Sequence, residues 1–188
     1  MAGLYIHIPF CASKCAYCGF YSVPSLKLKD TFLEALKNEI ASRNDYLNGE
    51  TVGTIYFGGG TPSLLNANEI SDLLSVIRDH YTIGANPEIT LEANPDTLSV
   101  AYLEALRTMG INRLSIGIQS FLDDDLRYLG RRHNATHAQQ CIGWAKAAGF
   151  DNLSLDLIYG LPTSNADRWN RNLDIFFSTG AHTFRPTP

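Results

Sequence analysis

Residues 4–18 read Leu-Tyr-Ile-His-Ile-Pro-Phe-Cys-Ala-Ser-Lys-Cys-Ala-Tyr-Cys, so an apolar run leads directly into three cysteines spaced CxxxCxxC. The apolar run is typical of a buried β-strand, and the cysteines then lie on the loop that follows it. Three thiolates can hold three corners of an iron-sulfur cluster. The fourth cysteine, Cys141, lies far away in a helical pattern. One corner of such a cluster would therefore stay open to a ligand that is not protein.

Zinc is the alternative metal for this triplet, with His7 or a distant residue as the fourth ligand. Structural zinc sites normally have four protein ligands in compact pairs, whereas this stretch offers three clustered cysteines. Soft thiolate ligands without a fourth partner nearby favour the iron-sulfur cluster.

Composition narrows the class of protein. The chain has 188 residues, 45% of them hydrophobic, which is enough for a sizeable core. Its 15 Lys and Arg against 19 Asp and Glu give a net charge of -4, which disfavours nucleic acid and anionic membranes and favours small partners. No apolar run approaches the roughly 18 residues of a membrane span, and the N-terminus lacks signal-peptide features. We therefore expect a cytoplasmic protein, whose clustered cysteines bind metal or act in catalysis.

Helical and strand-like patterns alternate along the rest of the chain. A helical pattern covers residues 29–47, Asn66 and Glu69 resemble a capping box before the next helix, and Gly110 and Gly149 suit left-handed helix ends. The later strand-like runs are residues 54–57, 88–93, 113–118 and 153–159. Such alternation predicts parallel strands covered by helices, in an open doubly wound sheet or in a (β/α) barrel.

Polar and glycine residues at the strand ends favour the barrel. After the cysteine loop of the first strand, they are Gly58–Gly60, Glu92 and Asn94, Gln119, and Asp156 within the fifth strand. The C-terminal ends of barrel strands build one shared site, whereas an open sheet concentrates its ligand near one switch point. We therefore expect a partial parallel (β/α) barrel with five β/α units.

The end of the chain breaks this pattern. Residues 185–188 read Arg-Pro-Thr-Pro, and two prolines remove backbone donors that a central strand needs. We therefore expect the sixth strand and a C-terminal region to be missing. Residues 1–188 would then be a fragment, the N-terminal part of a larger core domain.

Several of these residues have two interpretations. Gly58–Gly60 suits close approach to a ligand, or only a sharp turn. Buried carboxylates need partners, and Glu92, Gln119 and Asp156 together suit an ammonium group and ribose hydroxyls. Arg131 is either a solvated cation or a bidentate partner of a carboxylate. Three further residues are assigned to structure: His133, His137 and Cys141.

The cysteine motif followed by Gly-Gly-Gly-Thr-Pro resembles the radical S-adenosylmethionine (SAM) superfamily. Four further motifs resemble its branch of oxygen-independent coproporphyrinogen III oxidases and HemW-type haem chaperones. They are Tyr-Ile-His-Ile-Pro-Phe-Cys at residues 5–11, Glu-Ala-Asn-Pro at 92–95, Gly-Ile-Gln-Ser-Phe at 117–121 and Asp-Leu-Ile-Tyr-Gly-Leu-Pro at 156–162. The resemblance extends from Tyr5 to about residue 180.

This resemblance implies the cofactors and their residues. It places a [4Fe-4S] cluster on Cys11, Cys15 and Cys18, with SAM on the fourth iron. It implies reductive cleavage of SAM to methionine and a deoxyadenosyl radical. The residues implied around SAM are Tyr5, Gly59, Gly60, Thr61 and Glu92 at the methionine part, Arg131 at its carboxylate, Gln119 and Asp156 at the ribose, and Tyr17 at the adenine.

Phe20 separates the two members of that branch. The oxidases resemble CxxxCxxCxC, and this chain has Phe20 where their further cysteine stands. The resemblance therefore implies a haem chaperone, with haem as a further ligand and haem-less acceptor proteins as partners. The alternative is the oxidase, which decarboxylates coproporphyrinogen III to protoporphyrinogen IX, so whether the protein is an enzyme stays open. His7 is more typical of a residue that supports the cluster than of a haem ligand.

Overall fold

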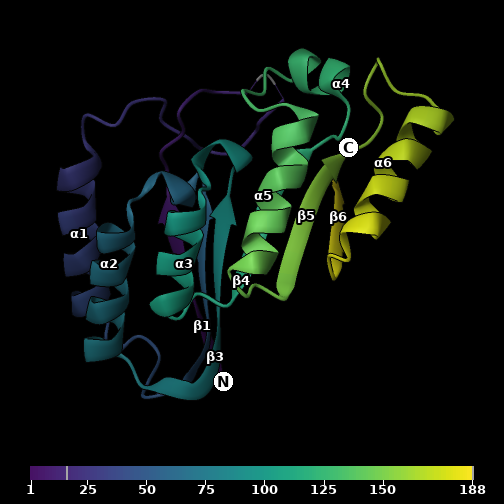
Figure 1. Cartoon of the computed structure of the whole chain (residues 1–188). Coiled ribbons are helices and arrows are strands. Elements are labelled where there is room, and N and C mark those ends of the chain that lie inside the picture. The colour runs from purple at the N-terminus through teal and green to yellow at the C-terminus, as the bar shows by residue number, and fades with distance from the viewer. Residues whose placement is uncertain (16, 188) are drawn as a thin grey trace.

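The computed structural model describes residues 1–15 and 17–187, and these form one six-stranded parallel sheet with helices between the strands (Figure 1). The strands are β1 (Ala2–Ile8), β2 (Val52–Gly59), β3 (Ile83–Ala93), β4 (Arg113–Gln119), β5 (Asn152–Ile158) and β6 (Thr183–Thr187). The α-helices are α1 (Lys29–Ser42), α2 (Ala67–His80), α3 (Val100–Thr108), α4 (Asp123–Tyr128), α5 (Ala135–Ala147) and α6 (Ala166–Thr179). Short 3₁₀ turns at Pro62–Leu64 and Pro95–Thr97 follow β2 and β3.

The strand order selects the barrel over the doubly wound sheet. Neighbours in the sheet run β1-β2-β3-β4-β5-β6, so each strand pairs with the next one in sequence and all pairs are parallel. Right-handed crossovers that always step the same way place all helices on one face. Figure 1 shows α1, α2, α3 and α5 side by side over the sheet. The predicted partial parallel (β/α) barrel is confirmed.

The core lies between the sheet and these helices. One row of the sheet aligns large apolar residues across five strands, because the strand register pairs each of them with the next. The members of this row are Ile6, Phe57, Leu91, Leu114 and Leu153, all buried. Side chains alternate between the two faces of a strand. The opposite face is therefore free for polar residues.

The polar face is concave. Arg185 in β6 lies 3.8 Å from Glu92 in β3, three strands away. Strands in a flat sheet are about 4.8 Å apart, so three steps would separate the two backbones by about 14 Å. The two long side chains therefore converge over the polar face, which forms the inner side of the partial barrel.

The expectation that no sixth strand is present is wrong. Residues 183–187 form β6, which pairs in parallel with β5 and covers its edge. The Thr187 carbonyl accepts from the Tyr159 amide at 2.9 Å, and alternate residues of a strand turn their backbone groups to opposite sides. Pro186 therefore faces away from β5. Its missing amide proton costs no ladder hydrogen bond, because β6 is the edge of the described sheet.

The helix boundaries follow local chemistry. Asn66 and Glu69 form the predicted capping box at the start of α2. Gly110 and Gly149, which follow α3 and α5, have φ of 104° and 86°, a region that glycine adopts without strain. The helix expected over residues 29–47 ends earlier, at Ser42. Among the described residues, none of the helices has both the length and the hydropathy that a membrane crossing requires.

Candidate functional site

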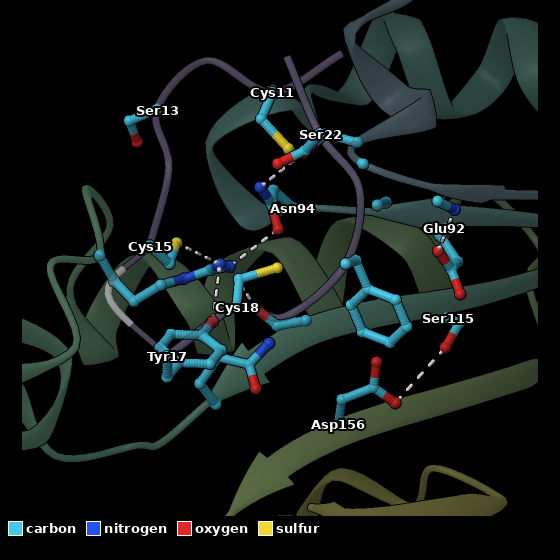
Figure 2. Close-up of a pocket in the computed structure, with 18 of the residues that line it drawn as sticks. Cys11, Ser13, Cys15, Tyr17, Cys18, Ser22, Glu92, Asn94, Ser115 and Asp156 are labelled. Atoms are coloured by element: carbon cyan, nitrogen blue, oxygen red, sulfur yellow. Dashed lines mark hydrogen bonds between the residues drawn. The ribbon is translucent and has the colours of Figure 1, made fainter. Parts of the chain in front are cut away.

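A pocket opens at the C-terminal ends of the strands, on the concave face (Figure 2). It gathers loops that follow β1, β2 and β3 and side chains from β4 and β5. All residues expected around the cluster and SAM line this pocket, except Tyr5. They are Cys11, Cys15, Cys18, Tyr17, Gly59, Gly60, Thr61, Glu92, Gln119, Arg131 and Asp156.

The cysteine loop is pinned at its base and reaches over the pocket. A parallel bridge joins Phe10 to Val23, with the Val23 amide donating to Pro9 at 2.7 Å and the Cys11 amide to Val23 at 3.2 Å. All three cysteines of the motif are free thiols of intermediate exposure. These hydrogen bonds hold the two ends of the loop together at the wall of the pocket.

The donor set fits an iron-sulfur cluster by its chemistry. Among residues 1–15 and 17–187, no three His, Cys, Asp or Glu side chains are gathered to hold one metal ion. Each cysteine of a cube-shaped cluster binds a different iron atom, so sulfurs spread around a shared pocket suit a cluster. Figure 2 shows Cys11 apart from Cys15 and Cys18 across the same opening.

The glycine turn after β2 is required by close backbone packing. A Cβ on Gly60 would lie 2.6 Å from the Phe10 carbonyl oxygen. Gly59 has φ of 115°, and a Cβ there would lie 2.6 Å from the His7 ring. Both glycines therefore let β1 and its cysteine loop approach β2. The Gly59 amide points into the site and donates to Glu92 Oε2 at 3.1 Å.

Glu92 is held by donors on both carboxylate oxygens. The Tyr56 hydroxyl donates to its Oε1 at 2.6 Å, and the Gly59 amide donates to its Oε2. Burial first, and the hydrogen bond to Glu92 second, raise the pKa of Tyr56. Tyr56 therefore stays protonated and keeps donating, so the Glu92 carboxylate is fixed in orientation.

Asp156 is the most perturbed carboxylate of the pocket. Burial raises its pKa to about 6, although Arg185 opposes that shift. Ser115 Oγ lies 3.4 Å from its Oδ1, and Arg185 Nε lies 4.0 Å away. At these distances the two partners stabilise the carboxylate by less than burial destabilises its charged form. Its charge therefore depends on pH in a range near neutrality.

Gln119 adopts a conformation rare for its residue type. Its φ is 69°, a left-handed value that costs energy outside glycine. The register between β4 and β5 shifts between Gly117 and Gln119. Such a bulge re-aims a side chain, and here it turns Gln119 into the pocket.

Arg131 contacts four other residues of the pocket and is therefore not a solvated cation. Its Nη2 donates to Asn94 Oδ1 at 2.8 Å and to the Gly117 carbonyl at 2.6 Å. Its Nη1 lies 3.4 Å from the Tyr17 hydroxyl and 3.8 Å from Cys15 Sγ. The guanidinium therefore ties the cysteine loop to the ends of β3 and β4.

Tyr5 lies outside the pocket, on the neighbouring part of the concave face. Its ring stacks on Tyr56 at 5.9 Å between centroids, and its hydroxyl lies 3.3 Å from His7 Nδ1. The link from Tyr5 to the pocket therefore runs through Tyr56 and Glu92.

The residues assigned to structure lie apart from the pocket. His133 bonds the Ile118 carbonyl at 3.2 Å and His137 the Pro95 carbonyl at 3.0 Å. Cys141 is fully buried in α5, and burial raises the pKa of its thiol to about 12. A neutral, enclosed thiol of this kind packs as an apolar residue.

Asn94, expected among the polar strand ends, lies in the pocket. Ser115 and Arg185 also line it and were not singled out in the sequence. Ser115 follows from the alternation along β4, since a buried serine between Leu114 and Ile116 faces the other side of the sheet. Arg185 had no signal, because its strand was not expected.

Comparison with known proteins identifies the family. A model described as the radical SAM superfamily matches residues 5–174. The chain is 40% identical over 167 residues to heme chaperone HemW of Escherichia coli, covering 87% of this chain and 44% of that protein. It is 36% identical over 182 residues to HemW of Mycobacterium tuberculosis, covering 95% and 47%. Oxygen-independent coproporphyrinogen III oxidase of Escherichia coli is 36% identical over 161 residues, covering 85% and 35%.

The solved structures agree with these relatives. The Escherichia coli coproporphyrinogen III oxidase HemN matches with a TM-score of 0.89 at 32% identity, over 97% of this chain and 43% of that chain. An archaeal Elp3 matches with a TM-score of 0.68 at 14% identity, which shows the fold alone. The chain spans less than half the length of the curated relatives compared here. Its sequence and its fold agree, and the chain belongs to the radical SAM superfamily.

Proposed function

We propose that Cys11, Cys15 and Cys18 hold a [4Fe-4S] cluster and that the pocket beside them binds SAM. The observation that carries this proposal is the convergence of residues from five separate β/α units on one pocket. The superfamily match supports the pair of cofactors. We also propose that residues 1–188 are the N-terminal part of the radical SAM core domain.

Each polar residue then has a definite task. Arg131 binds the SAM carboxylate while anchoring the cysteine loop, Glu92 accepts from the SAM ammonium group, and the turn at Gly59–Thr61 contributes backbone donors. Gln119 and Asp156 bond the ribose hydroxyls, and the backbone at Tyr17 contacts the adenine. When bound, the reduced cluster supplies one electron to SAM. Tyr5 supports this arrangement indirectly, by packing on Tyr56.

We propose that the parent protein is a HemW-type haem chaperone of the cytoplasm. Relatives with that name are 35–40% identical to this chain. Phe20 supports this choice, because it lines the pocket at the position of the further cysteine in the oxidase motif. Haem and haem-less acceptor proteins would then be its partners. The second candidate is the oxidase, which the likeness to HemN favours.

Anaerobic reconstitution tests the cofactor site. We expect about four iron atoms per chain, a broad absorbance in the visible range, and a changed electron paramagnetic resonance spectrum of the reduced cluster when SAM is added. Zinc binding without iron would contradict the cluster. An unchanged spectrum with SAM would contradict the SAM site.

An activity assay separates the two candidate functions. The reconstituted full-length parent protein is incubated with coproporphyrinogen III, SAM and a reductant, and the porphyrins are analysed by chromatography. We expect no protoporphyrinogen IX. Its formation, abolished by Cys15→Ala, would overturn the chaperone proposal. Haem transfer to a haem-free acceptor protein, followed by absorbance, is the expected positive result.

A further inference from the structure

Asn94 is held rigidly at the end of β3, beside the cysteine loop. Its backbone amide donates to Ser63 Oγ at 3.2 Å, and its carbonyl accepts from the Thr97 amide at 3.0 Å and the Thr97 hydroxyl at 2.8 Å. Its side chain contacts Arg131 at 2.8 Å and Thr61 at 3.3 Å. In Figure 2, Asn94 lies between Cys11 on one side and Cys15 and Cys18 on the other.

The partners of Asn94 fix which way its amide points. Arg131 has only donors, so the atom of Asn94 that faces it at 2.8 Å is the oxygen Oδ1. The other atom, Nδ2, then faces Thr61 Oγ1 and donates to it. The direction of this second hydrogen bond is therefore set by Arg131 through Asn94.

The hydrogen bond from Asn94 leaves the Thr61 hydroxyl free to donate its own proton to Cys11. A hydroxyl has one proton, and because its oxygen accepts from Asn94, that proton is free to donate elsewhere. Cys11 Sγ lies 3.5 Å from Thr61 Oγ1. Thr61 is 4% exposed, and a hydrogen bond in such largely buried surroundings is strong.

We propose that Asn94 is a positioning residue that directs the Thr61 hydroxyl proton onto Cys11 Sγ and thereby sets the reduction potential of the bound cluster. The inference rests on the proposed cluster site. Reduction adds negative charge to the cluster and its sulfur ligands, and a donor to a ligand sulfur stabilises that added charge. The Thr61 hydrogen bond therefore raises the potential.

Three substitutions test the relay by reductive titration followed by electron paramagnetic resonance. Thr61→Val removes the donor and is expected to lower the potential, while Thr61→Ser keeps the donor and is expected to restore the wild-type value. Asn94→Asp has only acceptors. It keeps the Arg131 contact but draws the Thr61 proton away from Cys11, so it is also expected to lower the potential.

The combined variant separates the relay from a simple charge effect. In the Thr61→Val background, Asn94→Asp can act only through its added charge, so its shift is expected to be smaller than in the wild-type background. Equal shifts in the two backgrounds would overturn the relay. If Asn94→Asp holds no iron, equal potentials for Thr61→Val and Thr61→Ser would still overturn the relay.

Iron loading distinguishes this inference from the proposed function. A wild-type chain that binds no iron contradicts the cluster site itself. A wild-type chain that binds iron, with a potential unmoved by Thr61→Val, contradicts only the relay. The titrations are run without SAM, so that SAM affinity does not enter the result.

Discussion

Cys15 is the cysteine of the motif whose sulfur contacts Arg131, with Nη1 3.8 Å from Sγ. We expect Cys15→Ala to abolish cluster retention, because two cysteines leave two iron corners without protein ligands. Iron content after anaerobic reconstitution measures the effect. Cys141→Ala is the control, since Cys141 is buried in α5; unchanged iron content in Cys15→Ala would contradict the site.

Asp156 gives the pocket a pH dependence of known sign. Its pKa is about 6 in the folded chain against an ordinary value of 3.8, because it is buried. Between these two values the folded state binds more protons than the unfolded state, so stability falls as pH rises from about 4 to about 6. We expect Asp156→Asn to gain about 1–3 kcal/mol relative to the wild type across that range.

Urea unfolding at pH 4 and pH 7.5 measures this difference. Asp151→Asn, a change at an exposed carboxylate, controls for the general loss of a negative charge. A constant difference between Asp156→Asn and the wild type at both pH values would show that burial of this carboxylate has no energetic effect.

At this scale the sequence identified residue types better than their contacts. Cys11, Glu92 and Asp156 were expected in the site and lie in it. The left-handed backbone of Gln119 and the hydrogen bonds of Asn94 were not expected. Both depend on strand register and on partners distant in sequence, which a local pattern does not contain.

Among the elements, α5 and its end offer a matched test of glycine conformation. Gly149 has φ of 86°, whereas Gly143 lies inside the helix with open space where a Cβ would be added. We expect Gly149→Ala to lower the free energy of unfolding by about 1 kcal/mol, because a side chain strains the left-handed backbone. Gly143→Ala should raise it by about 0.5–1 kcal/mol.

Urea midpoints of the two variants check these opposite signs. Both substitutions add the same methyl group to the same region of the fold, so a general effect of alanine would move both midpoints in one direction. That outcome would contradict the conformational explanation.

Elements with strong local signals were predicted well. The capping box at Asn66 and the glycine ends of α3 and α5 are local chemistry, and the structure has them. β6 was not predicted because Pro186 argues against a central strand. Proline is tolerated in an edge strand, and β6 is at the edge of the described sheet. Whether a strand lies at an edge is a property of the sheet, so the local sequence alone does not reveal it.

At the level of the whole molecule, the pocket joins the first half of the chain to the second. Arg131 and Asp156 face loops that follow β1 and β2, so a cofactor bound there connects both parts. We expect cluster loading to raise the melting temperature, because a ligand that binds only the folded state stabilises it.

Differential scanning fluorimetry of apo and reconstituted protein under anaerobic conditions measures this shift. Cys15→Ala serves as the control, and it should show no difference between the two preparations. A shift of the same size in this variant would mean that the stabilisation comes from iron bound elsewhere.

Local sequence patterns were sufficient to predict the parallel α/β class, the barrel and most of the pocket residues. Alternating patterns and polar strand ends are local signals that parallel strands bring to one edge. Three features could not be read from these patterns and follow from the folded chain: β6 completes the described sheet, Tyr5 lies beside the pocket, and Arg131 fixes Asn94 and through it Thr61. These features depend on sheet curvature and register, which bring together residues more than thirty positions apart.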